Sequence, residues 1–361
     1  MAKFWELSEE HQRHLIESKL EKYGKVIGAL ETPYSMVYTL QGDVVKVPRF
    51  VVAKAPKVDA AMADDQIRVR LLRFLHEVNH IYRTCHLSLI HRFGQIEIAY
   101  GLPFLISAKR HMTLRDAMEE GPLNVVTALA IAVQVSHAIA YIGKKGISAH
   151  QDLKAENIFL DDVTKKFRFG DVEPPYRYQA YVADLDMANA AILFNKPQGS
   201  RPYMAPEQYE KSVDGAPPVS LSRADVFAVG VNLFEMLTGG LHPLGERTTD
   251  VWPGRSGKWS HEEVWKNWAR NAANRLKQHS GSMDGDLTAL MISCFQPEPG
   301  NRPCAGDLET ALLSCLRSRD NGAHESLKAY LAQVDEDEAI GSDAGWPHMD
   351  DMYSRLQQQL L

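Results

Sequence analysis

The spacing of apolar residues changes along the chain, and each change predicts a different element. Residues 8 to 23 carry apolar positions at helical spacing among charges, which predicts an amphipathic helix. Residues 26 to 58 are rich in β-branched and aromatic residues and contain turn signals, which predicts a β-hairpin region. A charged amphipathic helix is predicted for residues 64 to 84, followed by short strands around 92–98 and 103–107.

The second half of the chain has a helical character. Two segments, Val125 to Ile142 and Ala224 to Leu237, are apolar on nearly all sides, as expected for helices at the centre of a large lobe. The pattern therefore predicts an α+β protein with a small, strand-rich N-terminal lobe, a larger helical lobe, and a connection near Ala108 to His111.

The two ends of the chain differ from the middle. Residues 1–23 are interpreted as an N-terminal helical extension, and residues 318–361 as an acidic C-terminal tail. The stretch QVDEDEAIGSDAG predicts a mobile segment, while MDDMYSRLQQQLL is compatible with a short terminal helix.

Composition narrows the class of protein. The chain has 361 residues, of which 45% are hydrophobic, so it can bury a large core. Its net charge of −6 gives no general attraction to nucleic acid or to an anionic membrane surface. The four cysteines lack metal-site spacing and are expected to be reduced thiols. The start of the chain has early charges, and the long apolar segment NVVTALAIAVQVSHAIAYI has polar residues, so we expect a cytoplasmic protein without a membrane span.

The polar run HQDLKAENIFL places Asp152, Lys154 and Asn157 directly before an apolar strand. Taken alone, these residues are equally well explained as turn formers that bond their own backbone. Four further motifs follow in order, however: VADLDMA, GSRPYMAPEQ, ADVFAVGV and PEPGNRP. This ordered set resembles the eukaryotic-type (serine/threonine) protein kinase family over roughly Gly24 to Arg317.

The resemblance implies a bilobal protein kinase fold, with a β-rich N-lobe of about residues 24–107 that contains one helix and a helical C-lobe of about residues 112–317. It also implies ATP and Mg²⁺ as cofactors and a protein as substrate. Regulatory partners are expected to act through the N-terminal helix or the acidic tail.

The resemblance assigns a task to each residue of the polar run. Asp152 would accept or orient the proton of the substrate hydroxyl, and Lys154 would neutralise the transferring phosphoryl oxygens. Asn157 and Asp184 would hold the magnesium ions. His150 is interpreted as a support beneath the metal-binding segment rather than as a base.

The N-lobe match implies a second set of residues, which would bind the nucleotide. Lys54 in FVVAKAPKV would grip the ATP phosphates and pair with Glu77, although Lys46 in DVVKVPR is an alternative. The family's glycine-rich loop, aligned on Val37, has Leu, Thr and Ser in place of its glycines, and only Gly28 lies nearby. This predicts weaker or differently shaped phosphate binding. Ala108, at the connection between the lobes, completes the expected nucleotide site.

Three further residues resemble structural members of the family. Glu207 and Arg302 would form a buried ion pair that fixes the activation segment, and Asp225 would cap the backbone of the catalytic loop.

The chain also departs from the family. Asp186 replaces the glycine of the usual Asp-Phe-Gly, which is explained equally well by a stiffer segment that favours Mn²⁺ over Mg²⁺ and by a solvent-facing turn aspartate. Gln151 stands at a common arginine position, and DLDMANAAILFNKPQG has no Ser, Thr or Tyr, so we expect activity without phosphorylation of this stretch. Lys154 and Ser200 resemble the serine/threonine type. The segment before Asp184 is longer than usual, which indicates a hairpin, a docking loop or a tolerated insertion.

Two other classes remain open. A small-molecule kinase of the aminoglycoside or choline type shares the HxDxxxxN pattern, but lacks a counterpart of YMAPE, ADVFAVGV and the late arginine. A pseudokinase that binds or scaffolds would explain the altered glycine loop, but has no chemical need for the complete set of transfer residues.

Overall fold

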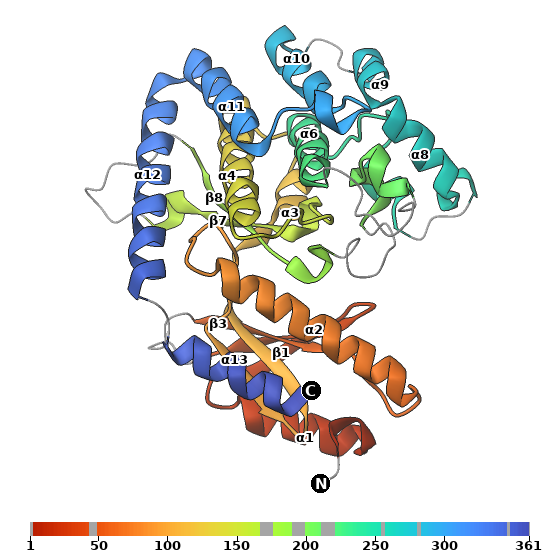
Figure 1. Cartoon of the computed structure of the whole chain (residues 1–361), viewed down its shortest axis with the longest axis vertical. Helices are drawn as coiled ribbons and strands as arrows, with labels where there is room; N and C mark the ends of the chain where they lie inside the picture. The colour runs from red at the N-terminus through yellow and green to blue at the C-terminus, as the bar shows by residue number, and fades with distance from the viewer. Residues whose placement is uncertain are drawn as a thin grey trace. The chain divides into compact units, whose positions relative to one another are not determined.

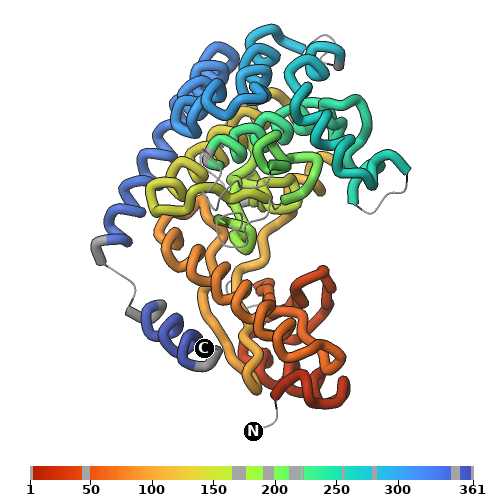
Figure 2. The backbone as a smooth tube through the Cα atoms, turned by 45° about the vertical axis from the view of Figure 1, so that its right-hand side comes forward, coloured from red at the N-terminus to blue at the C-terminus, as the bar shows by residue number. Residues whose placement is uncertain are grey.

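The computed structural model describes residues 3–42, 49–166, 176–189, 199–210, 221–253, 257–279, 283–344 and 347–360 of the chain (Figure 1). Its contacts form two units, which are described separately. Unit 1 comprises Met1–Cys85, Arg92–Arg110 and Gly341–Leu361, and unit 2 comprises His86–His91 and His111–Ile340. Figure 2 follows the backbone through both. The division into a strand-rich unit and a helical unit confirms the predicted bilobal α+β class.

Unit 1 is built on a five-stranded antiparallel sheet with the order β1-β2-β3-β5-β4. The strands span Lys25–Glu31, Ser35–Gln41, Phe50–Pro56, Gln95–Ala99 and Leu102–Ala108 for β1 to β5. β1 and β2 are joined by a turn at residues 32–34, within the predicted hairpin region. The β3 pattern alternates between buried and partly exposed positions, as expected for a strand with one face on a core.

Helix α2, Asp64–Thr84, agrees with the predicted amphipathic helix, and α1, Glu9–Leu20, lies within the predicted N-terminal one. Asp64 and Asp65 in the first turn of α2 and Arg83 in its last turn complement the helix dipole. Both helices contribute to the unit 1 core. They supply Leu20 and Leu71, and β2, β3, β5 and the N-terminal segment add, among others, Leu40, Ala53, Phe104 and Trp5.

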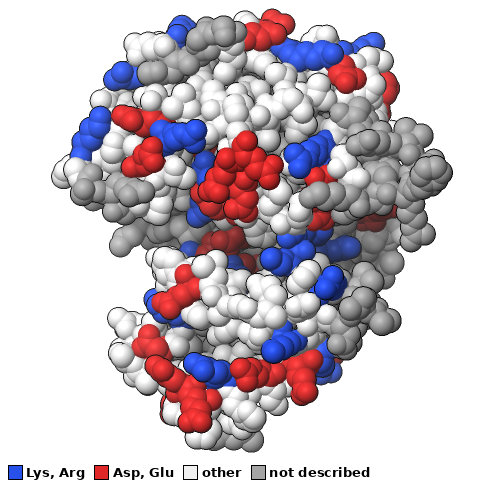
Figure 3. Space-filling model, turned by 180° about the vertical axis from the view of Figure 1, so that it is seen from behind, with Lys and Arg blue, Asp and Glu red and all other residues white. Residues whose placement is uncertain are grey.

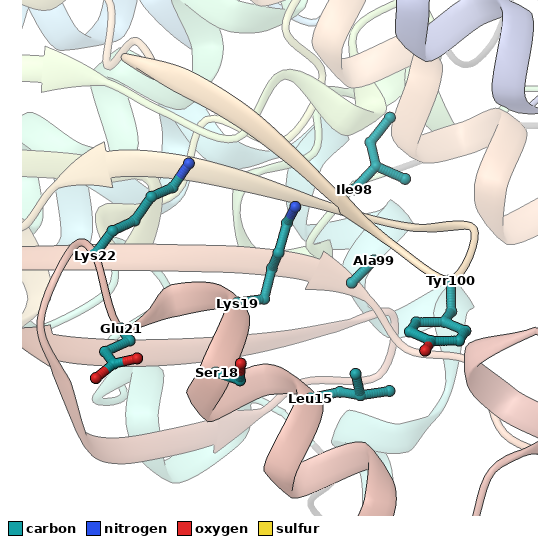
Figure 4. A pocket seen from close by; sticks show the side chains of 8 residues that line it. All are labelled: Leu15, Ser18, Lys19, Glu21, Lys22, Ile98, Ala99 and Tyr100. Atoms are coloured by element: carbon teal, nitrogen blue, oxygen red, sulfur yellow. The ribbon is translucent and has the colours of Figure 1, made fainter.

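A pocket of about 440 Å³ lies between α1 and the end of β4 (Figure 4). It is lined by Leu15, Ser18, Lys19, Glu21, Lys22, Ile98, Ala99 and Tyr100. The Nζ atoms of Lys19 and Lys22 lie 3.4 and 2.5 Å from the buried carboxylate of Glu97. These ion pairs attach the N-terminal helix to the sheet. No residue predicted for the nucleotide or catalytic site lines this pocket.

Unit 2 is centred on α4, Val125–Lys144, and α6, Ser222–Thr238, as predicted. Asn124 caps α4 by accepting a hydrogen bond from the Thr127 amide over 2.8 Å. A small sheet of β6 (Met112–Thr113), β7 (Ile158–Asp162) and β8 (Tyr178–Val182) lies beside α4. Among the described residues of this unit, the other α-helices are α3 (Leu114–Glu119), α7 (Thr248–Val251), α8 (Glu262–Arg270), α9 (Ala272–His279), α10 (Gly285–Cys294), α11 (Ala305–Arg319) and α12 (Asn321–Ala344), whose last four residues belong to unit 1.

Helix α4 has the length and apolar composition of a membrane-spanning segment, but 78% of its most apolar window is buried inside the protein. It is therefore packed as a core helix, as the polar residues in its sequence predicted. The four cysteines are free thiols. Charged side chains of both signs are interspersed on the face shown in Figure 3, and acidic ones gather in one patch on unit 2.

The expectation of a mobile acidic tail is wrong for the described residues after 318, because they form helices. The α12 residues Leu327, Leu331 and Val334 are buried, so this acidic helix has an apolar face. Helix α13, Pro347–Leu360, agrees with the predicted short terminal helix and packs against α2 and β4 of unit 1. The charges suggested a mobile tail, but in α12 they lie between apolar residues at helical spacing, which is the pattern of an amphipathic helix.

His137 of α4 joins α12 to the unit 2 core. Its Nδ1 lies 3.0 Å from Glu309 and its Nε2 lies 2.9 Å from Asp335 of α12. Burial lowers the pKa of His137, but the two carboxylates act in the opposite direction and the net pKa is raised. The protonated ring is therefore a favourable link between the helices.

This link makes stability depend on pH. Because the folded-state pKa is raised, the stabilisation is fully present below the unfolded-state pKa of about 6.5 and is lost as pH rises through the higher folded-state value. The His137→Gln variant should therefore lose this part of the pH dependence. Urea unfolding between acidic and mildly basic pH, with the exposed His261→Gln as control, measures it. Identical pH profiles for wild type and His137→Gln would contradict the expectation.

Candidate active site

The loop after α4 is held by the carboxylate of Asp225, in the first turn of α6. The backbone amides of His150 and Gln151 donate to its two oxygens over 2.8 and 3.0 Å. Gln151 has a φ of 67°, a left-handed conformation that a non-glycine residue keeps only when its surroundings hold it. Burial raises the pKa of Asp225, while His150 and the two donated amides act against that rise. The expected capping role of Asp225 is confirmed.

His150, in the loop after α4, is fully buried. Its Nδ1 accepts the amide of Asp152 at 3.3 Å, so the proton lies on Nε2, which donates to the carbonyl of Ala183 at 2.9 Å. Both ring nitrogens are thus engaged with backbone. This arrangement agrees with the interpretation of His150 as a support.

The carboxylate of Asp152 is fixed from three sides. Lys154 Nζ lies 2.9 Å from Oδ2, and the amide of Ser200 donates to Oδ1 over 2.8 Å. Asn157 Nδ2 donates to the Asp152 carbonyl at 2.9 Å and to Oδ2 at 3.3 Å. Burial lowers the pKa of Lys154, but Asp152 and Asp184 raise it by more, so Lys154 remains a cation. The predicted catalytic pair therefore lies together.

The register of β7 and β8 brings Asn157 and Asp184 to the same edge of the small sheet. Ile158 pairs with Val182, and the amide of Ala183 donates to the Asn157 carbonyl over 2.9 Å. The Nδ2 atom of Asn157 is engaged with Asp152, so Oδ1 is the side-chain atom that could bind a cation. An amide oxygen and a carboxylate are suitable donors for Mg²⁺ or Mn²⁺, so the residues fit a divalent cation.

The segment that follows Asp184 is described only in part. Leu185 is fully buried and Asp186 is partly exposed, both in a short 3₁₀ turn that begins at Leu185. Residues 190–198, where the absence of Ser, Thr and Tyr was noted, lie outside the described residues. So do residues 167–175 of the long segment before Asp184.

In unit 1, the ion pair expected from the sequence is present. Lys54 on β3 places its Nζ 2.8 Å from Oε1 of Glu77 on α2, and the Glu77 side chain is 5% exposed. Val37 lies opposite Lys54 in the β2–β3 register. The alternative lysine, Lys46, lies outside the described residues. The ion pair with Glu77 therefore supports Lys54 as the lysine predicted to bind the ATP phosphates.

The remaining nucleotide-site predictions fall on the same sheet. Gly28 lies in β1 next to a bulge, opposite Thr39, and a Cβ at this position would meet nothing within 4 Å. Space does not require a glycine here. Ala108 ends β5, opposite Val51. The nucleotide-binding roles of Gly28, Val37 and Ala108 stay predictions.

The turn between β1 and β2 closes on itself where the family has glycines. The Thr32 hydroxyl donates to the Ser35 carbonyl over 3.0 Å and accepts the Ser35 amide over 2.9 Å. Arg70 of α2 donates to the Pro33 carbonyl over 2.9 Å, and the Arg73 guanidinium lies 3.9 Å from the Tyr34 ring centroid. The Thr32 hydroxyl and two arginines of α2 thus hold a turn in which glycines would have no side chain to make such contacts.

Unit 2 also contains a buried charge network around Arg115, which the sequence analysis did not predict. Arg115 of α3 lies 3.0 Å from Glu156 of the catalytic loop and 3.4 Å from the fully buried Glu235 of α6, and it also donates to Tyr203. Burial raises the pKa of Glu235, and Arg115 opposes that rise. The acidic Glu156 within the polar run was a signal, but its partners are too distant in sequence to be identified.

The predicted ion pair between Glu207 and Arg302 is also present. Nη1 and Nη2 of Arg302 lie 2.6 and 2.8 Å from the two carboxylate oxygens, and the Arg302 side chain is 0% exposed. Arg302 also donates to the carbonyls of Gln296 and Pro297. This bidentate ion pair attaches the segment after Ser200 to the loop between α10 and α11.

The sequence of this chain is similar to those of known protein kinases. The family model described as protein tyrosine and serine/threonine kinase matches residues 52–312. A probable LRR receptor-like serine/threonine-protein kinase of Arabidopsis thaliana is 23% identical over 73% of this chain and 29% of its own length. Serine/threonine-protein kinase PknB of Mycobacterium tuberculosis is 24% identical over 76% and 40%. A dual serine/threonine and tyrosine protein kinase of Xenopus tropicalis is 25% identical over 62% and 21%.

The class defined by the fold and by these residues is the bilobal protein kinase. This chain belongs to the protein tyrosine and serine/threonine kinase family. The matched region of the chain spans less than half the length of these curated relatives.

Loss of one partner of the Glu207–Arg302 pair should be costly. Arg302→Met should lower the free energy of unfolding by about 3–5 kcal/mol, because it leaves a buried carboxylate without its cation. Adding Glu207→Leu should recover part of the loss. Urea denaturation measures both, with Arg270→Met as control because the Arg270–Glu210 pair is exposed. A loss below 1 kcal/mol in Arg302→Met would mean that the pair does not hold the segment.

Proposed function

We propose that this chain transfers the γ-phosphoryl group of ATP to serine and threonine hydroxyls of protein substrates. The observation that carries the proposal is the fixed Asp152 carboxylate, held by Lys154, Asn157 and the Ser200 amide. Positioning and charge stabilisation are the main contributions of a protein to phosphoryl transfer. Membership of the kinase family and the serine/threonine activity in the names of distant relatives point in the same direction.

In this proposal Asp152 orients the substrate hydroxyl and receives its proton as the new phosphate ester bond forms, while the bond between the γ-phosphorus and the bridging oxygen breaks and ADP leaves. The Ser200 amide holds Oδ1, so the carboxylate keeps one orientation towards the hydroxyl. Lys154 contributes a positive charge beside the transferring phosphoryl oxygens. Its raised pKa keeps that charge at neutral pH.

Asn157 and Asp184 are the residues that would hold Mg²⁺ or Mn²⁺. When bound, the cation supplies positive charge that shields the nucleotide phosphates. Asn157 contributes an amide oxygen whose direction is set by its bonds to Asp152, and Asp184 contributes a carboxylate. Lys54, paired with Glu77, would bind the α- and β-phosphates from unit 1.

Replacement of the catalytic carboxylate tests the proposal. Asp152→Asn should lower the transfer rate roughly 100- to 10 000-fold, because the amide cannot accept the hydroxyl proton. Asp184→Asn should also abolish transfer through loss of a cation ligand. The measurement is label transfer from ATP to a generic basic protein with Mg²⁺ or Mn²⁺, beside the exposed Asp250→Asn as control.

Three outcomes of this experiment argue against the proposal. ATP binding without transfer by the wild type would support a pseudokinase. Label only on added small alcohols would support a small-molecule kinase. Equal protein labelling by wild type and Asp152→Asn would remove Asp152 from the mechanism.

We further propose that transfer does not need phosphorylation of the segment after Asp184. Gln151 cannot pair with a phosphate as arginine does, and residues 184–199 contain no Ser, Thr or Tyr. Protein treated with a phosphatase, which is then removed, should keep its initial rate within about twofold, since a preserved site gives ΔΔG‡ near zero. A mock-treated sample is the control, and a rate loss restored by self-phosphorylation would contradict the proposal.

A further inference from the structure

Helix α2 carries Glu77 and is held on both sides of this residue in sequence. Before it, Arg70 and Arg73 contact the β1–β2 turn at Pro33 and Tyr34. After it, Tyr82 contacts α13, which lies outside the region matched by the family model. The position of Glu77 is therefore set by contacts at two points along one helix.

The contact between α2 and α13 is specific in geometry. The rings of Tyr82 and Tyr353 stack with centroids 5.1 Å apart and planes at 8°. The Tyr82 hydroxyl donates to the Asp350 carboxylate. This hydrogen bond, with smaller contributions from burial, raises the pKa of Tyr82 to about 12, so the hydroxyl is a donor at neutral pH.

Helix α13 also covers the edge of the sheet. β4 is the terminal strand, and the amide of Ile96 donates to the thioether sulfur of Met352 at 3.4 Å. Met352 is 9% exposed and Leu356, one turn later, is 0% exposed. These two residues form an apolar stripe that buries α13 on unit 1, while Arg355 beside it pairs with Asp351 in solvent.

We propose that α13 is a positioning helix for the Lys54–Glu77 pair, acting through Tyr82 and β4 to keep α2 in its place. This inference rests on the proposed function, because it assigns a regulatory input to the phosphate-binding lysine. Docked α13 favours the arrangement in which Glu77 lies 2.8 Å from Lys54. Undocked α13 leaves α2 with fewer restraints, and the paired arrangement is then less populated.

The effect on nucleotide binding follows from that population. If undocking reduces the paired state to about a tenth of the molecules, the apparent Kd for ATP rises roughly tenfold. The residues of α13 touch neither nucleotide nor substrate in this scheme. Any agent that competes for the Met352 and Leu356 stripe would weaken ATP binding from a distance.

The test uses full-length variants. Leu356→Asp places a charge in the buried stripe, and Arg355→Asp places the same charge on the exposed side of the same helix. Hydrogen–deuterium exchange of residues 74–80 should increase in Leu356→Asp and stay unchanged in Arg355→Asp. The apparent Kd for ATP should rise roughly tenfold in the first variant only, and the conservative Leu356→Met should keep the wild-type Kd.

A second background shows whether the effect passes through Glu77. In Glu77→Gln, adding Leu356→Asp should still increase exchange in α2 but should leave the Kd for ATP nearly unchanged. Tyr353→Ala provides an independent way to weaken the contact without a new charge. Tyr353→Ala should also increase exchange in α2 and raise the apparent Kd for ATP, both by less than Leu356→Asp does.

The outcomes separate this inference from the proposed function. Increased exchange in α13 without any change in α2 overturns the inference, as does unchanged exchange in α13 in both Leu356→Asp and Tyr353→Ala. A wild type that binds ATP but transfers no phosphate overturns the proposed function alone, because the exchange and binding measurements still decide the role of α13.

Discussion

The capture of two backbone amides by the Asp225 carboxylate is the interaction on which the rest of the site depends. It holds the loop in a conformation that Gln151, with its positive φ, would not adopt alone. Once the loop is fixed, Asp152 faces Lys154 and the Ser200 amide. The Asp225 carboxylate can accept both amides because α6 packs against other helices of unit 2 and places its first turn beside the loop.

Helix α6 supports the loop at more than one point. Asn232, further along the helix, donates to the carbonyl of Leu153 over 3.0 Å, and Glu235 joins the network of Arg115. These groups are buried, so each needs its partner to offset the cost of leaving water. The same bonds that stabilise unit 2 thus define the geometry of the predicted catalytic residues.

Sequence reasoning predicted most of the contacts that join motif residues. Lys54 with Glu77 was found because both residue types stand in recognisable contexts on a strand and a helix. The family's glycine-rich loop was expected at residues 32–34, but the contacts of this turn with Arg70 and Arg73 were missed, because α2 is distant in sequence. The Arg115 network was missed for a related reason: its members come from four separate segments, and no local spacing indicates that they meet.

The strand order of unit 1 has a practical consequence for work with a shortened protein. The family model's match begins at Val52, inside β3, so a fragment cut to the matched region lacks β1, β2 and the first two residues of β3. β3 lies between β2 and β5. Without β2, one side of β3 would expose backbone N–H and C=O groups that have no hydrogen-bond partner. Such edges promote pairing between molecules. A fragment for such work should therefore keep β1 and β2, although both lie outside the region that the family model matches.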